Sequence, residues 1–119
     1  MIKSTFLIKL KEEGKLELVE PSKEICDSYI EKANNSLKSA KLLLKNALYE
    51  NSVSMSYYTM YNSLTALLFR CGIKCENHSG SILILKKLFK RHDLFKIISW
   101  AKKERIDKQY YLTTEKNLF

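Results

Sequence analysis

The sequence predicts an all-α protein, an up-and-down bundle of about four to five helices, from three observations. The chain has 119 residues but only three Gly and one Pro, so it lacks the turn signals that sandwiches and barrels need. Apolar residues recur every three or four positions over two long stretches, which is the period of one helix face. Hydrophobic residues make up 45% and charged residues 29%, a balance typical of a folded domain. We expect a short N-terminal arm at residues 1–21 and one helical bundle at residues 22–119.

The N-terminal arm is expected to contain a short helix followed by an extended segment. Ser4 is a candidate N-cap for a helix over residues 5–13, and Gly14 is a natural stop for that helix. Residues 15–20 alternate polar and apolar side chains, which indicates extended chain and is compatible with an isolated strand.

The first long helix is predicted to begin at Ser22, which follows Pro21 and is a good N-cap residue. Its apolar residues are spaced by three or four positions over roughly seven turns, as expected for the buried face of a helix. These residues are Cys26, Tyr29, Ala33, Leu37, Ala40, Leu44 and Ala47. The other faces carry mostly Lys, Glu and Asn, which indicates a solvated surface.

The second long helix follows a break near residues 48–51 and is predicted to end at Gly72. It has two neighbouring apolar stripes, one of Val53, Tyr57, Met60, Leu64, Leu67 and Cys71, the other of Tyr58, Tyr61, Thr65 and Leu68. A helix that is apolar over so much of its circumference is central, or is shared with a second subunit. We interpret its tyrosines as core or interface residues rather than as a surface for stacking bases.

Two shorter helices are predicted in the rest of the chain. After a short polar loop, Ser79 is a candidate cap for a helix over residues 80–91. His92 and Asp93 are expected to break that helix, and a fourth helix is predicted over residues 94–104.

The net charge and the cysteines indicate which partners the protein could bind and where in the cell it is expected to be. The chain has 21 Lys and Arg against 13 Asp and Glu, a formal net charge of +8. This charge fits a polyanionic partner such as nucleic acid, or a lysine-rich surface that only keeps the protein in solution. Three cysteines without disulfide spacing, and no signal-peptide or membrane-spanning segment at the N-terminus, predict a cytoplasmic protein with reduced thiols and no membrane association.

The segment 70–80 holds the best candidates for chemistry. His78 lies just before a predicted helix N-terminus, where backbone N–H groups and the helix dipole favour an anion. Arg70 and Lys74 add positive charge nearby. A metal-free ribonuclease needs such an arrangement: a base to deprotonate the ribose 2′-hydroxyl, and cations to stabilise the phosphorane. Because one histidine cannot easily be both base and acid in one step, a two-fold dimer could supply the second copy.

Other interpretations of this segment stay open at this stage. His78 can be a local hydrogen-bonding residue, and Arg70 can simply complement the dipole of the helix that it ends. Cys71, Cys75 and His78 read C-x3-C-x2-H, with Cys26 as a conceivable fourth zinc ligand. The usual zinc knuckle is C-x2-C, and a second ligand pair is missing, so we predict no metal and no cofactor.

Three stretches of the sequence together resemble the HEPN domain family, in particular its small free-standing prokaryotic and archaeal branch. They are residues 33–44 with the following Leu48-Tyr49-Glu50, residues 54–68, and Gly72 with His78-Ser79-Gly80. The second is similar to the family's S-x-A-Y-Y-x-M-[FY]-x-(small)-x-x-A-L-L, and the third to its G…H-x-G at the start of the third helix. Further on, Arg105 and Tyr110 resemble the family's R-x4-Y, with Gln109 where an Asp is usual.

The resemblance implies a dimerising helical bundle that is the toxin of a toxin–antitoxin pair, with a minimal nucleotidyltransferase as partner. Many members are ribonucleases that use R-x(4–6)-H, assembled as a composite site across the dimer. Here seven residues separate Arg70 from His78. The implied catalytic residues are His78 and Arg70, and the implied phosphate- or nucleotide-binding residues are Asn77, Ser79, Gly80, Lys74 and Arg105.

Two further expectations follow from the same resemblance. The alternative to RNA cleavage is a non-catalytic module that binds a nucleotide or docks a nucleotidyltransferase. Relatives usually add another long helix after the R-x4-Y region, whereas this chain stops at Phe119, soon after a capping signal at Thr113 and Thr114. We therefore expect either a truncated chain or a partner that covers the exposed face.

Overall fold

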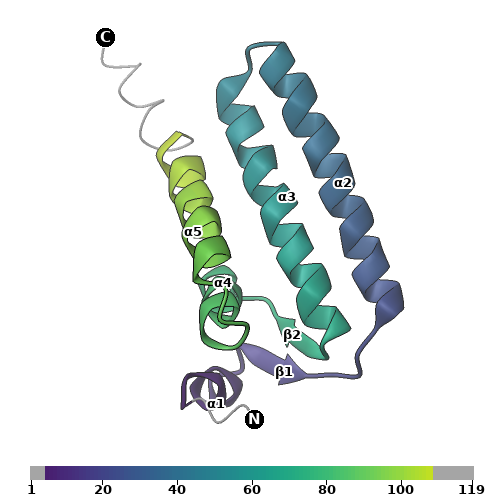
Figure 1. Cartoon of the computed structure of the whole chain (residues 1–119), viewed down its shortest axis with the longest axis vertical. Coiled ribbons are helices and arrows are strands. Elements are labelled where there is room, and N and C mark those ends of the chain that lie inside the picture. Colours follow the sequence, from purple (N-terminus) through teal and green to yellow (C-terminus); the bar gives the residue numbers. More distant parts are fainter. Residues whose placement is uncertain (1–4, 109–119) are drawn as a thin grey trace.

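The computed structural model describes residues 5–108, which form five helices and a two-stranded ribbon. In chain order they are α1 (Thr5–Glu12), β1 (Leu16–Leu18), α2 (Lys23–Lys45), α3 (Tyr49–Arg70), β2 (Ile73–Cys75), α4 (His78–Lys87) and α5 (His92–Ile106). Figure 1 shows α2, α3 and α5 side by side, with α4 at the base of α5, and α1 and the ribbon across the lower end. The predicted all-α bundle is confirmed. Tyr110, Thr113 and Thr114 lie outside the described residues.

The first long helix begins where the sequence predicts. The side-chain oxygen of Ser22 accepts a hydrogen bond at 3.0 Å from the backbone N–H of Ile25, which satisfies one of the free donors of the first turn of α2.

α2 packs mainly on α3, and small residues let the two helices approach closely (Figure 1). Ala33 and Ala40 are buried, at 5% and 4% exposure. The prediction that the whole apolar stripe is buried is wrong for Leu37 and Leu44, which are 40% and 57% exposed. The physical reason is that one neighbouring helix covers only a narrow strip of α2, so the leucines at its edges remain in solvent.

α3 is the central helix, as its two apolar stripes predict. It packs against α2, α4, α5 and β2, and Tyr57, Leu64 and Leu68 on it are at most 5% exposed. It ends at Arg70 rather than at the predicted Gly72, which follows two residues later with a φ of +79°. Cys71, predicted to lie in the buried stripe, is instead exposed at the C-terminal cap of α3.

The prediction of a polar loop after α3 is wrong, because Ile73–Cys75 at the start of that segment form the strand β2. β2 pairs antiparallel with β1, with Leu16 opposite Cys75 and Leu18 opposite Ile73. Ile73 and Cys75 are buried, at 5% and 8% exposure, while Lys74 between them points to the other face. β1 itself confirms the extended segment predicted at residues 15–20.

The predicted limits of the two shorter helices also need correction. Asn77, not Ser79, is the N-cap of α4, because its extended backbone lets its Oδ1 accept a hydrogen bond at 2.6 Å from the backbone N–H of Gly80. α4 ends at Lys87, and α5 already begins at His92. His92 and Asp93 therefore open a helix rather than break one.

Replacement of Gly72 by Ala is expected to destabilise the protein by about 3 kcal/mol or more, from backbone strain plus a steric clash. An added Cβ would lie 2.6 Å from the carbonyl oxygen of Val19 and 3.2 Å from the ring of Pro21. The matched control is Gly14→Ala: Gly14 has a similar φ of +74°, but its Cβ would meet nothing within 4 Å, so only about 1–2 kcal/mol is expected. Urea unfolding of both variants measures the difference, and equal losses would contradict this explanation.

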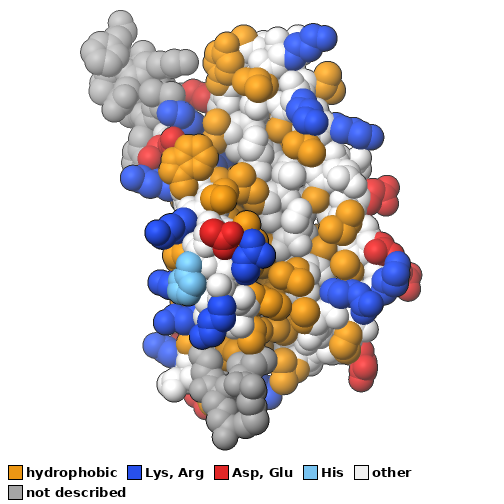
Figure 2. Space-filling view, viewed as in Figure 1, with side chains coloured by type: hydrophobic (Ala, Val, Ile, Leu, Met, Phe, Trp, Pro, Cys, Tyr) orange, Lys and Arg blue, Asp and Glu red, His pale blue; other side chains and the backbone are white. Residues whose placement is uncertain are grey.

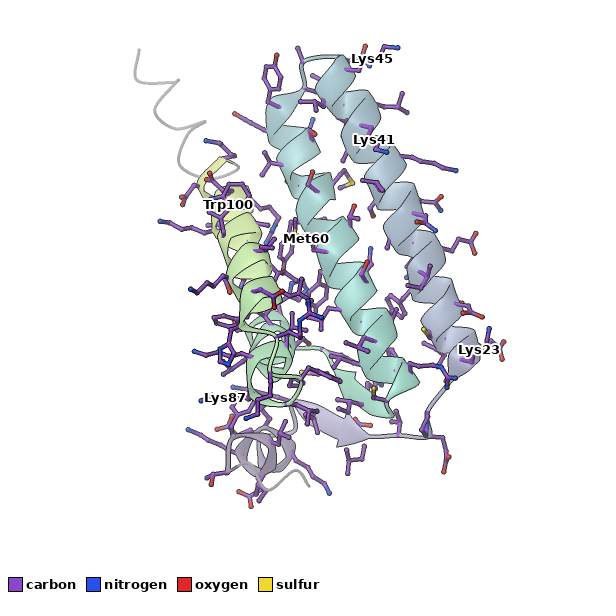
Figure 3. All side chains as sticks on the ribbon, viewed as in Figure 1. Lys23, Lys41, Lys45, Met60, Lys87 and Trp100 are labelled. Atoms are coloured by element: carbon purple, nitrogen blue, oxygen red, sulfur yellow. The ribbon has the colours of Figure 1, made fainter. Side chains whose placement is uncertain are left out.

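On the face that Figure 2 shows, the positive charge is not gathered into a single patch. Figure 2 shows Lys and Arg side chains mainly along the two sides of the view, with hydrophobic side chains between them. Lys23, Lys41 and Lys45 all lie on α2 (Figure 3). Among residues 5–108, no helix is both long enough and apolar enough to cross a membrane.

Candidate functional site

His78 is the first residue of α4 and lies against the middle of α3. β2 and the Asn77 cap fix this position, because they end the ribbon and start the helix immediately before it. The backbone N–H groups of a first helical turn have no carbonyl partner within the helix, and they carry the positive end of its dipole. The imidazole therefore lies at a place that favours an anion.

Two tyrosines of α3 hold the imidazole of His78. The ring of Tyr61 stacks on it, with centroids 3.8 Å apart and planes 12° from parallel. The hydroxyl of Tyr57 is hydrogen-bonded to Nδ1 of His78 at 2.8 Å. Residues four apart share one helix face, so α3 presents both rings to the same side. The hydroxyl of Tyr61 has a different partner, Oγ of Ser81 at 3.3 Å.

α5 brings two cations to the same place. Nζ of Lys102 donates a hydrogen bond at 2.7 Å to Oγ of Ser79, the residue after His78. The guanidinium of Arg105 lies over the rings of Tyr57 and Tyr58, with Cζ 5.4 Å and 5.5 Å from their centroids. Lys102 and Arg105 are three residues apart and so share one face of α5. The site thus combines the start of α4, the middle of α3 and the last turns of α5.

The charges and burial of the site shift the pKa of its groups. Burial, and then the positive charges of Lys102 and Arg105, lower the pKa of His78 from its ordinary 6.5. Burial raises the pKa of Tyr57 to about 12, partly offset by the nearby Arg105. At neutral pH the imidazole is therefore uncharged and the Tyr57 hydroxyl keeps its proton.

We expect Lys102→Met to raise the pKa of His78, because it removes one of the two positive charges that disfavour the imidazolium. In the wild-type protein, folded His78 binds its proton less tightly than the same residue does in the unfolded chain. The free energy of unfolding therefore decreases as the pH falls from 6.5 through the lower pKa of folded His78. An NMR titration of the His78 ring protons in both proteins measures the shift. A pKa of His78 that is unchanged in the variant would contradict the assignment.

The structure places Arg70 and Lys74 away from this cluster. Arg70 is the last residue of α3, nine residues after Tyr61, which corresponds to about 13 Å along the helix axis. Lys74 lies on the ribbon opposite Glu17 and forms an ion pair with Glu76 at 3.4 Å. The structure therefore brings Arg105, but not Arg70 or Lys74, next to the tyrosines that hold His78.

The remaining predicted binding residues have structural partners. The side chain of Asn77 caps α4, and the backbone N–H of Gly80 is taken up by that cap. Gly80 is buried, and an added Cβ would lie 3.4 Å from Sγ of Cys75. Ser79 is the member of this group whose side chain meets a cation of the site. Among the described residues, no three or more His, Cys, Asp or Glu side chains are placed to hold a metal ion.

Sequence reasoning missed three contributors to the site, namely Tyr57, Tyr61 and Lys102. The sequence pattern predicts that both tyrosines are core residues, and they are indeed buried, but they also contact His78. The available signals were the four-residue spacing of the tyrosines and the three-residue spacing of Lys102 and Arg105. Neither spacing shows by itself that α3 and α5 meet at the start of α4.

Comparison with known protein families matches residues 26–117 to the HEPN domain. The match covers most of the chain, so this protein belongs to the HEPN domain family. The resemblance noted from its sequence motifs is thereby confirmed.

Curated relatives with detectable similarity come from archaea and bacteria. "Putative toxin MJ0605" of Methanocaldococcus jannaschii is 35% identical over 60 residues, which cover 50% of this chain and 45% of the relative. "Putative toxin MJ0142" of the same organism is 32% identical over 94 residues, 75% of this chain and 64% of the relative. "UPF0332 protein PH1297" of Pyrococcus horikoshii is 39% identical over 59 residues, 50% of this chain and 42% of the relative.

These matches span 42 to 64% of the length of the three relatives. No solved structure matches the chain significantly.

Proposed function

We propose that this HEPN protein is the toxin of a toxin–antitoxin pair and that it binds RNA at His78, Lys102 and Arg105 and cleaves it without a metal. The observation that carries the proposal is the convergence of two cations from α5 on an uncharged imidazole at the start of α4. The printed names of two relatives as toxins support the biological role.

The proposed chemistry uses groups that are already in place. Cleavage of RNA by its own 2′-hydroxyl requires proton transfer from that hydroxyl and to the leaving 5′-oxygen, and stabilisation of a phosphorane with extra negative charge. Lys102, Arg105 and the first-turn N–H groups of α4 would supply the stabilisation. His78 is the group at this position whose ordinary pKa suits proton transfer near neutral pH.

A second copy of the chain would bring a second imidazole to the reaction. Each protomer has one imidazole in the site, and the two proton transfers are most easily divided between two groups. α5 has apolar side chains available for an interface: Ile97 is 50% and Trp100 62% exposed, and Trp100 lies on the surface near the top of α5 (Figure 3). A groove between α3 and α5, lined by Met60, Ile97 and other apolar residues, continues this surface. Light scattering of the purified chain tests the proposed homodimer.

The decisive assay is incubation of the purified chain with a labelled RNA in EDTA. We expect cleavage, with products that end in a 2′,3′-cyclic phosphate, because the 2′-hydroxyl is the attacking group. RNA left intact by a protein that binds it would overturn the catalytic proposal.

The second candidate function is a non-catalytic module that binds a nucleotide or docks a minimal nucleotidyltransferase. It is favoured by the lack of a second imidazole beside His78 among the described residues, and by the seven-residue gap between Arg70 and His78. Nucleotide binding or copurification with a nucleotidyltransferase, in either case without RNA cleavage, would support it. A protein that binds neither RNA nor nucleotides and retains no partner would contradict both functions.

A further inference from the structure

The buried hydroxyl of Tyr57 has a consequence for the protonation of His78. The side chain of Tyr57 is fully buried, so its hydroxyl cannot reach water. Its hydrogen-bond partner among the described residues is Nδ1 of His78, at 2.8 Å. A buried donor left without an acceptor is rare in folded proteins. The hydroxyl proton of Tyr57 therefore points to Nδ1, and Nδ1 must be the unprotonated nitrogen of the neutral ring.

We propose that Tyr57 is a positioning residue that holds neutral His78 in the tautomer with its proton on Nε2. In this tautomer Nε2, the ring nitrogen that is not bonded to Tyr57, is a hydrogen-bond donor. His78, Lys102 and Arg105 then form a set of donors, which suits a phosphate oxygen rather than the hydrogen of a hydroxyl group. The hydroxyl of Tyr61 cannot set the tautomer, because it is bonded to Ser81, and its ring only covers the face of the imidazole.

This inference deepens the proposed function, and its part about phosphate rests on that function. It assigns the resting imidazole to phosphate binding and not to removal of the 2′-hydroxyl proton within the same protomer. To act as a base through Nε2, the ring would first have to move its proton to Nδ1. That step would reverse the bond to Tyr57 and leave the buried hydroxyl without an acceptor. The base would therefore be a group other than the resting His78, because a second copy would hold its own imidazole in the same way.

The neighbouring charged groups are compatible with this tautomer. The positive charges of Lys102 and Arg105 on α5 both favour the uncharged form of the imidazole, and Tyr57 keeps its own proton. Among the described residues, no carboxylate is bonded to the ring to stabilise a proton on Nδ1. The two α3 tyrosines and the two α5 cations are thus consistent with one protonation state.

The test is nitrogen NMR of the full chain without any ligand, above pH 7.5, using His92→Gln as the background so that His78 gives the only ring signals. We expect the coupling pattern of a single tautomer protonated on Nε2. An unconstrained imidazole also favours that tautomer, so the decisive measurement is the response to Tyr57→Phe. This change removes the hydroxyl and keeps the ring, and we expect the Nδ1 resonance to move. Tyr61→Phe is the matched control and should leave it in place.

A wild-type coupling pattern that shows the proton on Nδ1, or an Nδ1 resonance that does not move in Tyr57→Phe, would overturn the assignment.

The proposed role in phosphate binding is tested with an RNA oligonucleotide that carries 2′-O-methyl groups, which the proposed reaction cannot cleave. Because the side-chain amide of Gln can donate from nearly the same place as Nε2, His78→Gln should bind this RNA more tightly than His78→Ala. Equal affinities of the two variants would contradict the donor role. Neither readout requires RNA cleavage, so the inference and the proposed function can fail separately.

Discussion

His78→Ala is expected to reduce RNA cleavage in EDTA by about 100-fold or more, which is the range for loss of a group that transfers a proton or donates a hydrogen bond in the transition state. The change removes the only imidazole at the start of α4 and leaves the cations of α5 in place. RNA binding should therefore fall much less than cleavage does, because phosphate affinity comes mostly from cations. The cleavage rate under single-turnover conditions and the RNA affinity are measured on the same protein samples.

His92→Ala is the matched control for that experiment. His92 is the second histidine of the chain and lies exposed at the first position of α5, as His78 lies at the first position of α4. It has none of the tyrosine contacts of His78, and its replacement should leave cleavage unchanged. Equal rates for wild type and His78→Ala would exclude a catalytic role for this residue.

Tyr57→Ala is expected to cost about 3–5 kcal/mol of unfolding free energy, the typical loss for a large buried aromatic side chain. Tyr57 is fully buried in the main core and contacts Tyr58, Tyr61 and His78. Its removal would open a cavity at the centre of α3 and take away the ring beneath Arg105. Urea denaturation followed by circular dichroism measures this loss.

Tyr57→Phe separates the two roles of this residue. It keeps the ring and loses one hydrogen bond, so the expected cost is about 1 kcal/mol. If Tyr57→Ala were no more destabilising than Tyr57→Phe, the ring would not be part of the core as described. The large difference expected is also the reason why the phenylalanine variant, and not the alanine variant, is the suitable probe of the His78 tautomer.

The two long helices could be predicted because their signals are local. Ser22 caps α2 and Gly72 ends the turn after α3, and each acts on neighbouring residues of the chain. The strand at residues 73–75 could not be predicted in the same way, because its partner β1 lies far earlier in the sequence. That pairing also decides the start of α4, since it leaves Asn77 rather than Ser79 in the extended conformation of a cap.

Only some residues of the candidate site could be predicted from the sequence. His78 could be identified from its place before a helix, and Arg105 from the resemblance to the family. Arg70 and Lys74 are candidates only because they are close to His78 in sequence, whereas the structure places them at the end of α3 and on the ribbon. Lys102 comes from a later helix, and its approach to Ser79 depends on the packing of α5 against α3 and α4. Proximity of this kind is a property of the fold and leaves no local pattern.

We propose above all that RNA phosphate binds where α4 begins and α5 ends. The most direct test is amide NMR of the full chain, titrated with a 2′-O-methyl RNA oligonucleotide. We predict that the largest shifts fall on His78 and Ser79 and on the turn of α5 from Lys102 to Arg105, and that they weaken with added salt. Shifts concentrated at Arg70 and Lys74, or along the lysines of α2, would place the binding surface elsewhere and contradict the claim.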